Sequence, residues 1–598
     1  MRARKGSVAA VLFVLAVAVF PFAFPDPYHI GVGISAGAMA VSTVGLVLLL
    51  GLAHQLAIGQ AAFSMIGGYA NGILCVRYGW DPFLAMVLGA VLAMFGAWAV
   101  AAPILKLRGF VLAMATLALH LMLIVAAVEL PFTGGPIGVT GIPKFRILLL
   151  PLSDDRSFYF FVWLMALGAV WIGLNIDRSR IGRALRGIAA SEIAAGSVGI
   201  DIARHKVEMF VIGAGMASVS GSLLVHYLRA TDPTVFSFSY SINMITGTII
   251  GGLTSVWGGA LGAALILGLR EMLRDLDLPL WESVIMGALT VVVLIAFPRG
   301  VAGFASALYD RAFGGRAATR VTVGAPGAVT LPAIADTPDN VPILEVVGVS
   351  RSFGSLRAVS GVSFTARRGA ITALIGPNGA GKTTMFNLIG GYQPLDAGVI
   401  RFDGREIQTL PPREVARLGI GRTFQNLQLF ETMTVLENVM CGHYRLMASG
   451  IFDISLRLPR VDAEEAEARR AARAALGVVG LCGAETLNPA ALSFGHQRLV
   501  EIARALALRP ELLLMDEPAS GLNDVETERL SELILRIAAL GVSVLVVEHD
   551  MRLVMGLADH VVVMDHGEKM SEGTTDRVRT DPNVIAAYLG QAEAENAV

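Results

Sequence analysis

Cysteine is scarce in this sequence, which contains only Cys75, Cys441 and Cys482. Their spacing fits neither a metal-ligand motif nor a disulfide framework, so we expect packing roles for them in a reducing environment. An excess of charge of one sign is also absent, because 47 Lys and Arg offset 48 Asp and Glu to leave a net charge of −1. This balance produces no strong field that would favour nucleic acid or an acidic partner.

Charged residues are sparse in the first half of the chain in particular. Charged residues make up 16% of the chain, and most of them lie beyond about residue 340. The earlier half consists of long apolar runs rich in Gly and Ala, which are typical of membrane helices. We therefore expect a polytopic α-helical membrane domain in residues 1–304. Residues 305–342, rich in Ala, Gly, Thr and Pro, predict a linker, and 591–598 a short tail.

A membrane helix needs about 20 apolar residues. The apolar runs that satisfy or approach this length are 8–24, 31–50, 56–76, 83–105, 110–130, 158–176, 207–228, 241–269 and 284–297. The first run follows a basic N-terminus, as a signal peptide does, but no small-residue cleavage site is obvious and further apolar runs follow at once. We interpret it as a membrane helix.

Basic residues in short loops indicate which side faces the cytoplasm. The segment 177–206 carries several Arg and Lys residues and is predicted to be cytoplasmic. Six predicted crossings precede it, which places the N-terminus on the same side, in agreement with its basic residues. We expect a multi-pass protein of the inner (plasma) membrane with its soluble half in the cytoplasm.

The run 241–269 is too long for one crossing and is interrupted by Gly251-Gly252 and Gly258-Gly259. Two short or re-entrant segments would keep the soluble half on the cytoplasmic side, which gives about eight to ten crossings in all. Polar residues within or beside the spans are His54, Gln55, Gln60, Asn71, His120 and Glu129. Such groups either belong to a transport pathway or bond between helices, and Glu129 fits an interfacial position.

The second half, residues 343–590, alternates β-rich runs with helical patterns and predicts an α/β domain with a largely parallel sheet. An apolar strand from Ala373 leads into a loop of the form G-x-x-x-x-G-K-[ST] and then into a helix. Such a loop points backbone N–H groups at phosphates, its lysine reaches the β/γ-phosphates and its Thr holds Mg²⁺. The residues expected to bind ATP are Gly376, Asn378, Gly379, Gly381, Lys382, Thr383 and Thr384, with Thr383 also a Mg²⁺ ligand.

A second apolar strand, residues 512–515, ends in Asp516 and Glu517. An aspartate at a strand end beside bound phosphates can hold the metal. Glu517, one residue further, can polarise the attacking water. We therefore expect Asp516 to be a metal ligand and Glu517 the catalytic base.

Four further segments and one aromatic residue, Phe353, resemble motifs of ABC-transporter nucleotide-binding domains, in the same order and spacing. Arg422–Gln425 resembles the Q-loop, 492–497 the signature motif, 520–523 the D-loop and 546–550 the switch segment. The resemblance implies that Gln425 contacts Mg²⁺ and the membrane partner and that His549 is the switch histidine. It also implies that Phe353 stacks on adenine.

The signature motif of this family completes the ATP site of a second ATPase. Ser493 and Gly495, at the phosphate-facing positions, match the common form, whereas Phe494 and His496 depart from it. The resemblance therefore implies an ATP-dependent pair of ATPase domains, in which Ser493 and Gly495 bind a γ-phosphate held by the partner.

The membrane half resembles the permease of the branched-chain, or hydrophobic, amino acid uptake family. The matching segments are 59–69, 107–117, 133–143, 179–185, 192–200 and 250–258. The ATPase half resembles the first ATP-binding subunit of the same family, so two subunits that are usually separate look fused here. Residues 188–202 have the acidic-Ala-Ala then Gly pattern of the coupling helix that such permeases insert into the ATPase, although a solvated cytoplasmic helix is the alternative.

The resemblance implies an ATP-driven importer of branched-chain amino acids that uses ATP and Mg²⁺. It also implies a second permease and a second ABC ATPase (or a second copy of this chain), and an extracytoplasmic substrate-binding protein. We expect the substrate carboxylate at helix N-termini near Gly251 and Gly258. A urea or short-amide importer is the main alternative; an exporter, a non-transport ATPase and a gated channel fit the sequence less well.

Overall fold

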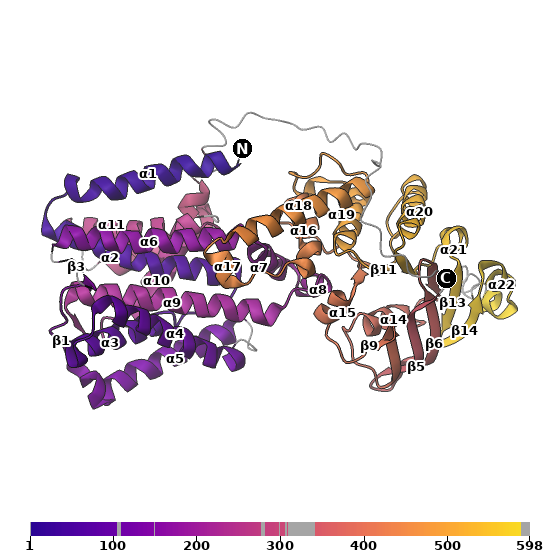
Figure 1. The fold of residues 1–598 in the computed structure, drawn as a ribbon, viewed down its shortest axis with the longest axis horizontal. Coiled ribbons are helices and arrows are strands. Elements are labelled where there is room, and N and C mark those ends of the chain that lie inside the picture. Colours follow the sequence, from indigo (N-terminus) through magenta and orange to yellow (C-terminus); the bar gives the residue numbers. More distant parts are fainter. Residues whose placement is uncertain are drawn as a thin grey trace. The chain divides into compact units, whose positions relative to one another are not determined.

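The computed structural model describes residues 2–104, 109–148, 150–152, 154–276, 281–297, 300–304, 308 and 341–587. The predicted tail and nearly all of the predicted linker lie outside these residues. The chain forms two compact units, which Figure 1 colours from indigo to yellow along the sequence. The first contains the described residues of 1–185, 203–318 and 451–457, and the second those of 186–202, 319–450 and 458–598.

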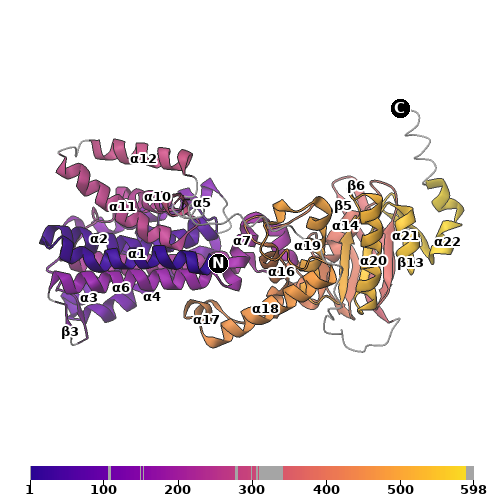
Figure 2. The same ribbon diagram turned by 90° about the horizontal axis from the view of Figure 1, so that it is seen from above.

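The first unit consists mainly of long helices that run side by side (Figures 1 and 2). They are α1 (Arg2–Ala23), α2 (Pro27–Leu46), α3 (Ala61–Tyr78), α4 (Pro82–Ile104), α5 (Phe110–Glu129), α6 (Asp155–Asp177), α9 (Ile202–Leu228), α10 (Phe238–Gly251), α11 (Val256–Asp275) and α12 (Glu282–Ala296). The π-helix η1 (Val47–Leu52) continues α2, and the short helix α17 (Ile451–Ser455) packs on α6. Short strands β1 (Val139–Thr140) and β4 (Ala230–Thr231) pair antiparallel, as do β2 (Arg146–Ile147) and β3 (Leu150–Pro151).

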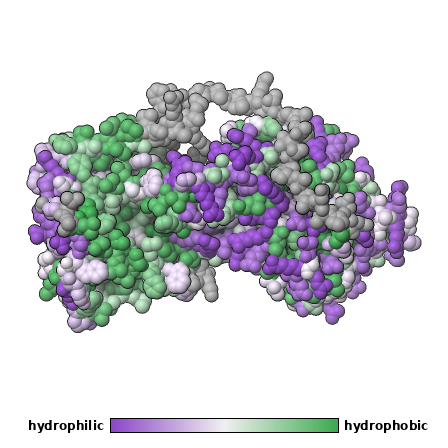
Figure 3. Space-filling view, in the orientation of Figure 1, coloured by the Kyte–Doolittle hydropathy of each residue, from purple (hydrophilic) through white to green (hydrophobic). Residues whose placement is uncertain are grey.

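Burial differs sharply among these helices. Helix α2 packs against both α6 and α11 and is buried along most of its length. By contrast, α4, α5 and α12 expose large apolar side chains such as Phe95, Met122 and Ile295. The face of this unit seen in Figure 3 is correspondingly green, or hydrophobic, over much of its area. Within the described residues, seven helices are long and apolar enough to cross a membrane, in agreement with the polytopic helical domain expected from the sequence.

The run 241–269 is divided as its glycines predict, because α10 ends at Gly251 and α11 begins at Val256. The two helices approach so closely that side chains would not fit between them. A Cβ at Gly262 would lie 1.8 Å from the carbonyl oxygen of Gly247, and one at Gly251 equally close to that of Gly258. Small residues permit such contact between membrane helices, where van der Waals packing holds helices together.

This packing contradicts the expected carboxylate site at the broken helices. The N–H of Gly258 donates to the carbonyl of Ser255 at 2.8 Å. Carbonyl oxygens of Gly251 and Gly252 lie 2.7 Å from the position that a Cβ on Gly258 would take. The space beside these glycines is therefore filled by acceptor oxygens, which repel a carboxylate.

The second unit contains two sheets. The larger has the strand order β10 (Ile420–Arg422), β11 (Leu512–Asp516), β12 (Ser543–Val547), β7 (Ile371–Ile375), β13 (His560–Asp565) and β14 (Glu568–Gly573). Its strands are parallel except β14, which pairs antiparallel with β13. The smaller sheet is antiparallel, in the order β6 (Leu356–Arg367), β5 (Pro342–Phe353), β8 (Ala397–Phe402) and β9 (Arg405–Glu406). The α/β fold predicted for this half is confirmed.

Every residue of β7, β11 and β12 is buried, as expected for central parallel strands covered on both faces. The helices of this unit are α8 (Glu192–Ser197), α14 (Lys382–Ile389), α15 (Pro412–Leu418), α16 (Val435–Gly442), α18 (Pro459–Val478), α19 (Phe494–Ala507), α20 (Asp524–Ala539), α21 (Met551–Leu557) and α22 (Thr575–Arg579). Helix α7 (Arg180–Ala190) runs from the first unit into the second.

Because β7, β11 and β12 run parallel, their carboxyl ends lie at one edge of the sheet. Ligands of parallel sheets bind at this edge.

The glycine contact between α10 and α11 predicts a position-specific stability effect. We expect Gly262→Ala to lower the stability of the purified protein by about 1–3 kcal/mol, because its methyl group forces the two backbones apart. Thermal unfolding in detergent, followed by tryptophan fluorescence, measures this change. Gly268→Ala on the same helix is the matched control, since a Cβ there meets nothing within 4 Å. Equal melting temperatures for the two variants would contradict the packing argument.

Candidate nucleotide site

The phosphate-binding loop joins β7 to α14 in the strand–loop–helix order that its sequence predicts. Gly376, Gly379 and Gly381 have φ values of 152°, 84° and 96°, where a side chain would be strained. A Cβ at Gly376 would lie 2.0 Å from the carbonyl oxygen of Met564, and one at Gly381 would lie 2.2 Å from that of Ala358. Only glycine therefore allows the loop to pack against strands β13 and β6.

Lys382 begins α14 and folds back over this loop. Its Nζ donates to the carbonyl oxygens of Gly376 (2.5 Å) and Pro377 (2.9 Å). Burial lowers the pKa of the Lys382 ammonium, while the carboxylates of Glu517 and Asp516 act in the opposite direction. The ammonium is thus held above the loop where phosphate oxygens would arrive.

The two acidic residues after β11 have different surroundings. Asp516 is buried, and burial raises the pKa of its carboxyl. The guanidinium of Arg422, 3.5 Å away, acts in the opposite direction and lowers this pKa. Glu517 has a φ of 44°, and its N–H donates to the carbonyl of Val547 on β12 (2.9 Å). This constrained backbone turns the Glu517 side chain toward the phosphate loop rather than continuing the strand.

Three of the predicted catalytic residues come together around the Glu517 carboxylate. The side-chain amide of Gln425 donates to Glu517 Oε2 at 2.9 Å. His549, which follows β12, places Nδ1 at 3.9 Å from the same oxygen. Segments well separated in the sequence, with Gln425 lying 92 residues before Glu517, thus converge at the carboxyl edge of the sheet.

A cavity of about 490 Å³ opens beside the phosphate loop. The predicted residues that line it are Phe353, Asn378, Gly379, Gly381, Lys382, Thr383, Thr384, Gln425 and Glu517. Gly376, Asp516 and His549 lie next to this group without lining the cavity. The exposed ring of Phe353, with the Arg351 guanidinium 5.0 Å from its centre, offers a flat apolar surface for a planar base.

No sequence motif pointed to Leu356, Arg357 and His566, which also line the cavity. Leu356 and Arg357 begin β6, after a two-residue turn that follows Phe353, and His566 occupies the tight turn between β13 and β14. The His566-Gly567 pair between two strands was a usable turn signal, but nothing in the sequence indicated that this turn reaches the nucleotide cavity.

Oxygen ligands suitable for a divalent cation are present here. Asp516 Oδ1 is buried and has no hydrogen-bond partner among the described residues. Thr383 and Gln425 contribute a hydroxyl and an amide oxygen at the adjacent cavity. Mg²⁺ prefers such oxygen ligands, so these residues fit the expected ion.

Ser493 and Gly495 are not among the residues that line this cavity. Ser493 caps α19, and its hydroxyl lies 2.9 Å from His496 Nδ1. Phe494 is exposed, with its ring against Gly521. The unusual Phe and His residues therefore shape the start of the helix and leave the Ser493–Gly495 backbone at the surface.

A buried ionic cluster fixes the Q-loop, and sequence reasoning did not identify it. Arg498, Glu501 and Arg504 lie on α19 with almost no exposed surface. Arg498 donates to the carbonyls of Phe424 (2.5 Å) and Gln425 (2.8 Å) and pairs with Glu501 at 3.0 Å. Three charged residues at i, i+3 and i+6 on one helix were the available signal, but this pattern usually marks a solvated face.

Residues 186–202 belong to the second unit, where α8 packs against α15. Ala194 lies in a buried cluster with Phe430, Met433 and Cys441. Tyr392 donates its hydroxyl to the carbonyl of Ile193 at 3.2 Å. The segment is thus packed into the ATPase fold, which excludes the alternative of a freely solvated helix.

The polar residues of the helical unit are placed differently from one another. His120 is buried, and its Nε2 donates to the carbonyl of Phe236 (2.8 Å). In the same unit, Asn71 Oδ1 accepts hydrogen bonds from His226 Nε2 (3.0 Å) and Cys75 Sγ (3.1 Å). Glu129 and His54 are exposed. Gln55 and Gln60 are buried, and their amide groups have no partners within the described part of the chain.

Family models match three parts of the chain. Residues 30–294 match the branched-chain amino acid transport system permease component, 359–520 match the ABC transporter model, and 568–594 match the branched-chain amino acid ATP-binding cassette transporter.

Similar proteins cover the second half. The high-affinity branched-chain amino acid transport ATP-binding protein BraF of Pseudomonas aeruginosa is 43% identical over 252 residues, which are 42% of this chain and 99% of that protein. The corresponding protein LivG of Escherichia coli is 40% identical over the same shares. A crystal structure of a nucleotide-free ATP-binding cassette from an ABC transporter is 32% identical, with a TM-score of 0.37, over 42% of this chain and 99% of that one. The chain therefore belongs to the branched-chain amino acid transport family of ABC proteins, with a permease component and an ATP-hydrolysing ABC ATPase joined in one polypeptide.

Proposed function

We propose that this chain is the permease and ATPase of an inner-membrane importer that takes branched-chain amino acids into the cytoplasm. The observation that carries the substrate class is the agreement of two independent parts of the chain. The permease match and the ATPase relatives both bear the name of branched-chain amino acid transport. An extracytoplasmic binding protein delivers the substrate, and the ATPase unit lies in the cytoplasm.

ABC transporters work with paired permease and ATPase subunits, so this chain acts with such partners or with a second copy of itself. In our proposal Ser493 and Gly495 complete the ATP site of the partner ATPase. Their position outside the chain's own cavity supports this, because groups that serve a partner must stay at the surface.

Within the chain's own site, Glu517 acts as the general base. Its carboxylate accepts from Gln425 and lies close to His549, so a water between Glu517 and the γ-phosphate can be polarised in line. Thr383, Asp516 and Gln425 would hold Mg²⁺, which would supply positive charge beside the phosphates. Phe353 stacks on the adenine, and Lys382 exchanges its loop carbonyls for phosphate oxygens.

Residues 188–202 transmit the state of the ATPase to the permease. The support is their packing: Ala194 is buried beside Phe430, and Asp201 pairs with Arg413 of α15 at 3.3 Å. A shift of α15 would therefore move the segment that leads directly into α9 of the permease.

The first expected outcome concerns the base. Glu517→Gln should retain ATP binding and lose hydrolysis by about 10²-fold or more, because a positioned base is removed while the amide keeps the shape. Phosphate release by the assembled transporter, together with binding of a fluorescent ATP analogue, measures both properties. Glu528→Gln, an identical change at an exposed site on α20, should leave both unchanged. Turnover near the wild-type rate in Glu517→Gln would remove Glu517 from the mechanism.

The second expected outcome concerns coupling. Gly199 has a φ of 85° and lies against Arg445 and Arg417. We expect Gly199→Val to preserve ATP affinity but abolish substrate-stimulated hydrolysis and uptake. Gly348→Val is the control for backbone strain, since Gly348 has a φ of 59° in the same unit with nothing within 4 Å of its Cβ position. If both variants took up substrate equally well in reconstituted vesicles, residues 188–202 would be only a packed loop.

The third expected outcome separates amino acids from urea and short amides. Uptake of radiolabelled leucine into vesicles, with the binding protein supplied, should be inhibited by excess valine or isoleucine. Urea and acetamide should have little effect, because they carry neither the charges nor the apolar bulk of the substrate. Strong inhibition by urea with none by valine would replace the amino-acid assignment with the urea one.

A further inference from the structure

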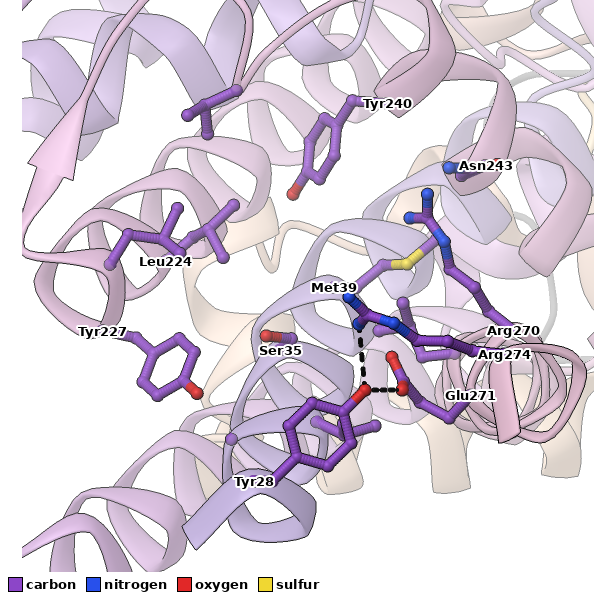
Figure 4. Close-up of a pocket in the computed structure, with 15 residues that line it drawn as sticks. Tyr28, Ser35, Met39, Leu224, Tyr227, Tyr240, Asn243, Arg270, Glu271 and Arg274 are labelled. Carbon is purple, nitrogen blue, oxygen red and sulfur yellow. Dashed lines mark hydrogen bonds between the residues drawn. The ribbon is translucent and has the colours of Figure 1, made fainter. Parts of the chain in front are cut away.

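A cavity of about 590 Å³ opens in the helical unit, between helices α2, α9, α10 and α11. Its size falls in the range of about 300–1,000 Å³ that is usual for small-molecule sites. The residues lining it come from the beginning of α2, the end of α9, the beginning of α10 with Val235 shortly before it, and the end of α11. All four helix ends therefore meet at one end of the bundle, and Figure 4 shows their side chains around a common space.

One wall of this cavity is charged. Helix α11 contributes Arg270, Glu271 and Arg274. Tyr28 donates its hydroxyl to Glu271 Oε2 and accepts a hydrogen bond from Arg274 Nη1 at 3.0 Å, as the dashed lines in Figure 4 show. The network uses one oxygen of the Glu271 carboxylate and fixes the direction in which the other one points. With two guanidinium groups and one carboxylate, this wall has a net positive charge.

The facing walls carry neutral polar groups. Tyr227 on α9 and Tyr240 on α10 point their hydroxyls into the space, and Ser35 on α2 lies between them (Figure 4). Asn243 on α10 also lines the cavity. These groups add donors and acceptors without altering the balance of charge.

The remaining lining is aliphatic. Met39 is buried at the base of the cavity, and Leu224 and Val235 are partly buried along its side. A pocket with charges of both signs on one wall and aliphatic side chains on another suits a small molecule that carries a positive and a negative group at one end and an aliphatic group at the other.

We propose that this cavity binds the α-amino acid substrate as a zwitterion at the end of the permease that faces away from the cytoplasm. The assignment rests on the import function and the orientation proposed above. In that orientation α9 starts in the cytoplasm, so its end at Tyr227, together with Tyr28 and Arg274, faces the side where a binding protein delivers substrate.

The substrate carboxylate bonds with Arg270, whose planar guanidinium suits bidentate contact with two oxygens. The ammonium bonds with the Glu271 oxygen that Tyr28 does not use. The branched side chain lies against Met39, Leu224 and Val235, where removal of apolar surface from water favours binding. Tyr28 and Arg274 are positioning residues that hold Glu271 in place.

Leucine, leucinamide (without the carboxylate) and 4-methylpentanoate (without the ammonium) test each contact separately. Their binding to the full-length chain in lipid nanodiscs is measured by competition with radiolabelled leucine. We expect wild-type protein to prefer leucine over either analogue by about tenfold or more, since each lacks one charged hydrogen-bonding group. Arg270→Gln should abolish the preference over leucinamide, and Glu271→Gln the preference over 4-methylpentanoate.

Controls are available at exposed positions of the same unit that do not line the cavity. Arg156→Gln and Glu129→Gln make the same chemical changes on α6 and α5 and should retain both preferences. A variant that merely unfolds would lose all three ligands together, so the selective loss of one preference identifies the contact.

The outcomes separate this assignment from the proposed function. If wild-type protein in vesicles takes up leucine, and Arg270→Gln and Glu271→Gln leave both the KM of uptake and the ligand preferences unchanged, the cavity is not the substrate site although the import function stands. If the chain binds urea or acetamide in place of leucine, and neither substitution alters that binding, both the function and the site are wrong.

Discussion

The nucleotide site depends on a buried ionic cluster on α19. Arg498 and Arg504 bracket Glu501, and their guanidiniums hold the carbonyls of the segment from Phe424 to Gln428. That segment carries Gln425, whose amide bonds to Glu517. The same helix begins at the signature residue Ser493. One helix thus connects the segment that carries Gln425, the Glu517 carboxylate to which Gln425 bonds, and the exposed segment at Ser493. Removal of any one charge would leave the others buried without compensation.

The helical unit follows a different constraint. Backbone groups within a bilayer must be satisfied by the protein itself, so the chain forms helices and interrupts them only where neighbouring chain covers the break. The break at 252–255 is covered in this way, because glycines on α10 and α11 bring carbonyl and backbone atoms into contact. Close packing at this break leaves no room for substrate. A cavity lies instead at the ends of α2, α9, α10 and α11, where larger polar side chains such as Tyr227 and Arg270 line it.

Residues 186–202 belong to the second unit but lie in the sequence between two stretches of the first. This stretch is continuous in sequence with the permease helices α6 and α9, yet its buried side chains pack with the ATPase residues Phe430, Met433 and Cys441. Burial of small residues such as Ala194 allows α8 to approach α15 closely. The coupling role proposed for residues 188–202 depends on this packing, because the ATPase and the permease fold as separate units.

The sequence alone determined the phosphate loop, the two acids after β11 and the order of the ABC motifs. These depend on local geometry: a left-handed φ requires glycine at 376, 379 and 381, and a strand end presents the next two side chains. The apolar runs likewise determined the polytopic fold, since their length must match the bilayer. Tertiary structure alone decided which distant residues share a site. The buried charges of α19 look like a solvated face in sequence, and Tyr28 and Glu271 are separated by more than two hundred residues before α2 and α11 pack together. It also showed that backbone atoms lie beside Gly251 and Gly258, because sequence reveals that a helix breaks but not which atoms fill the space beside the break.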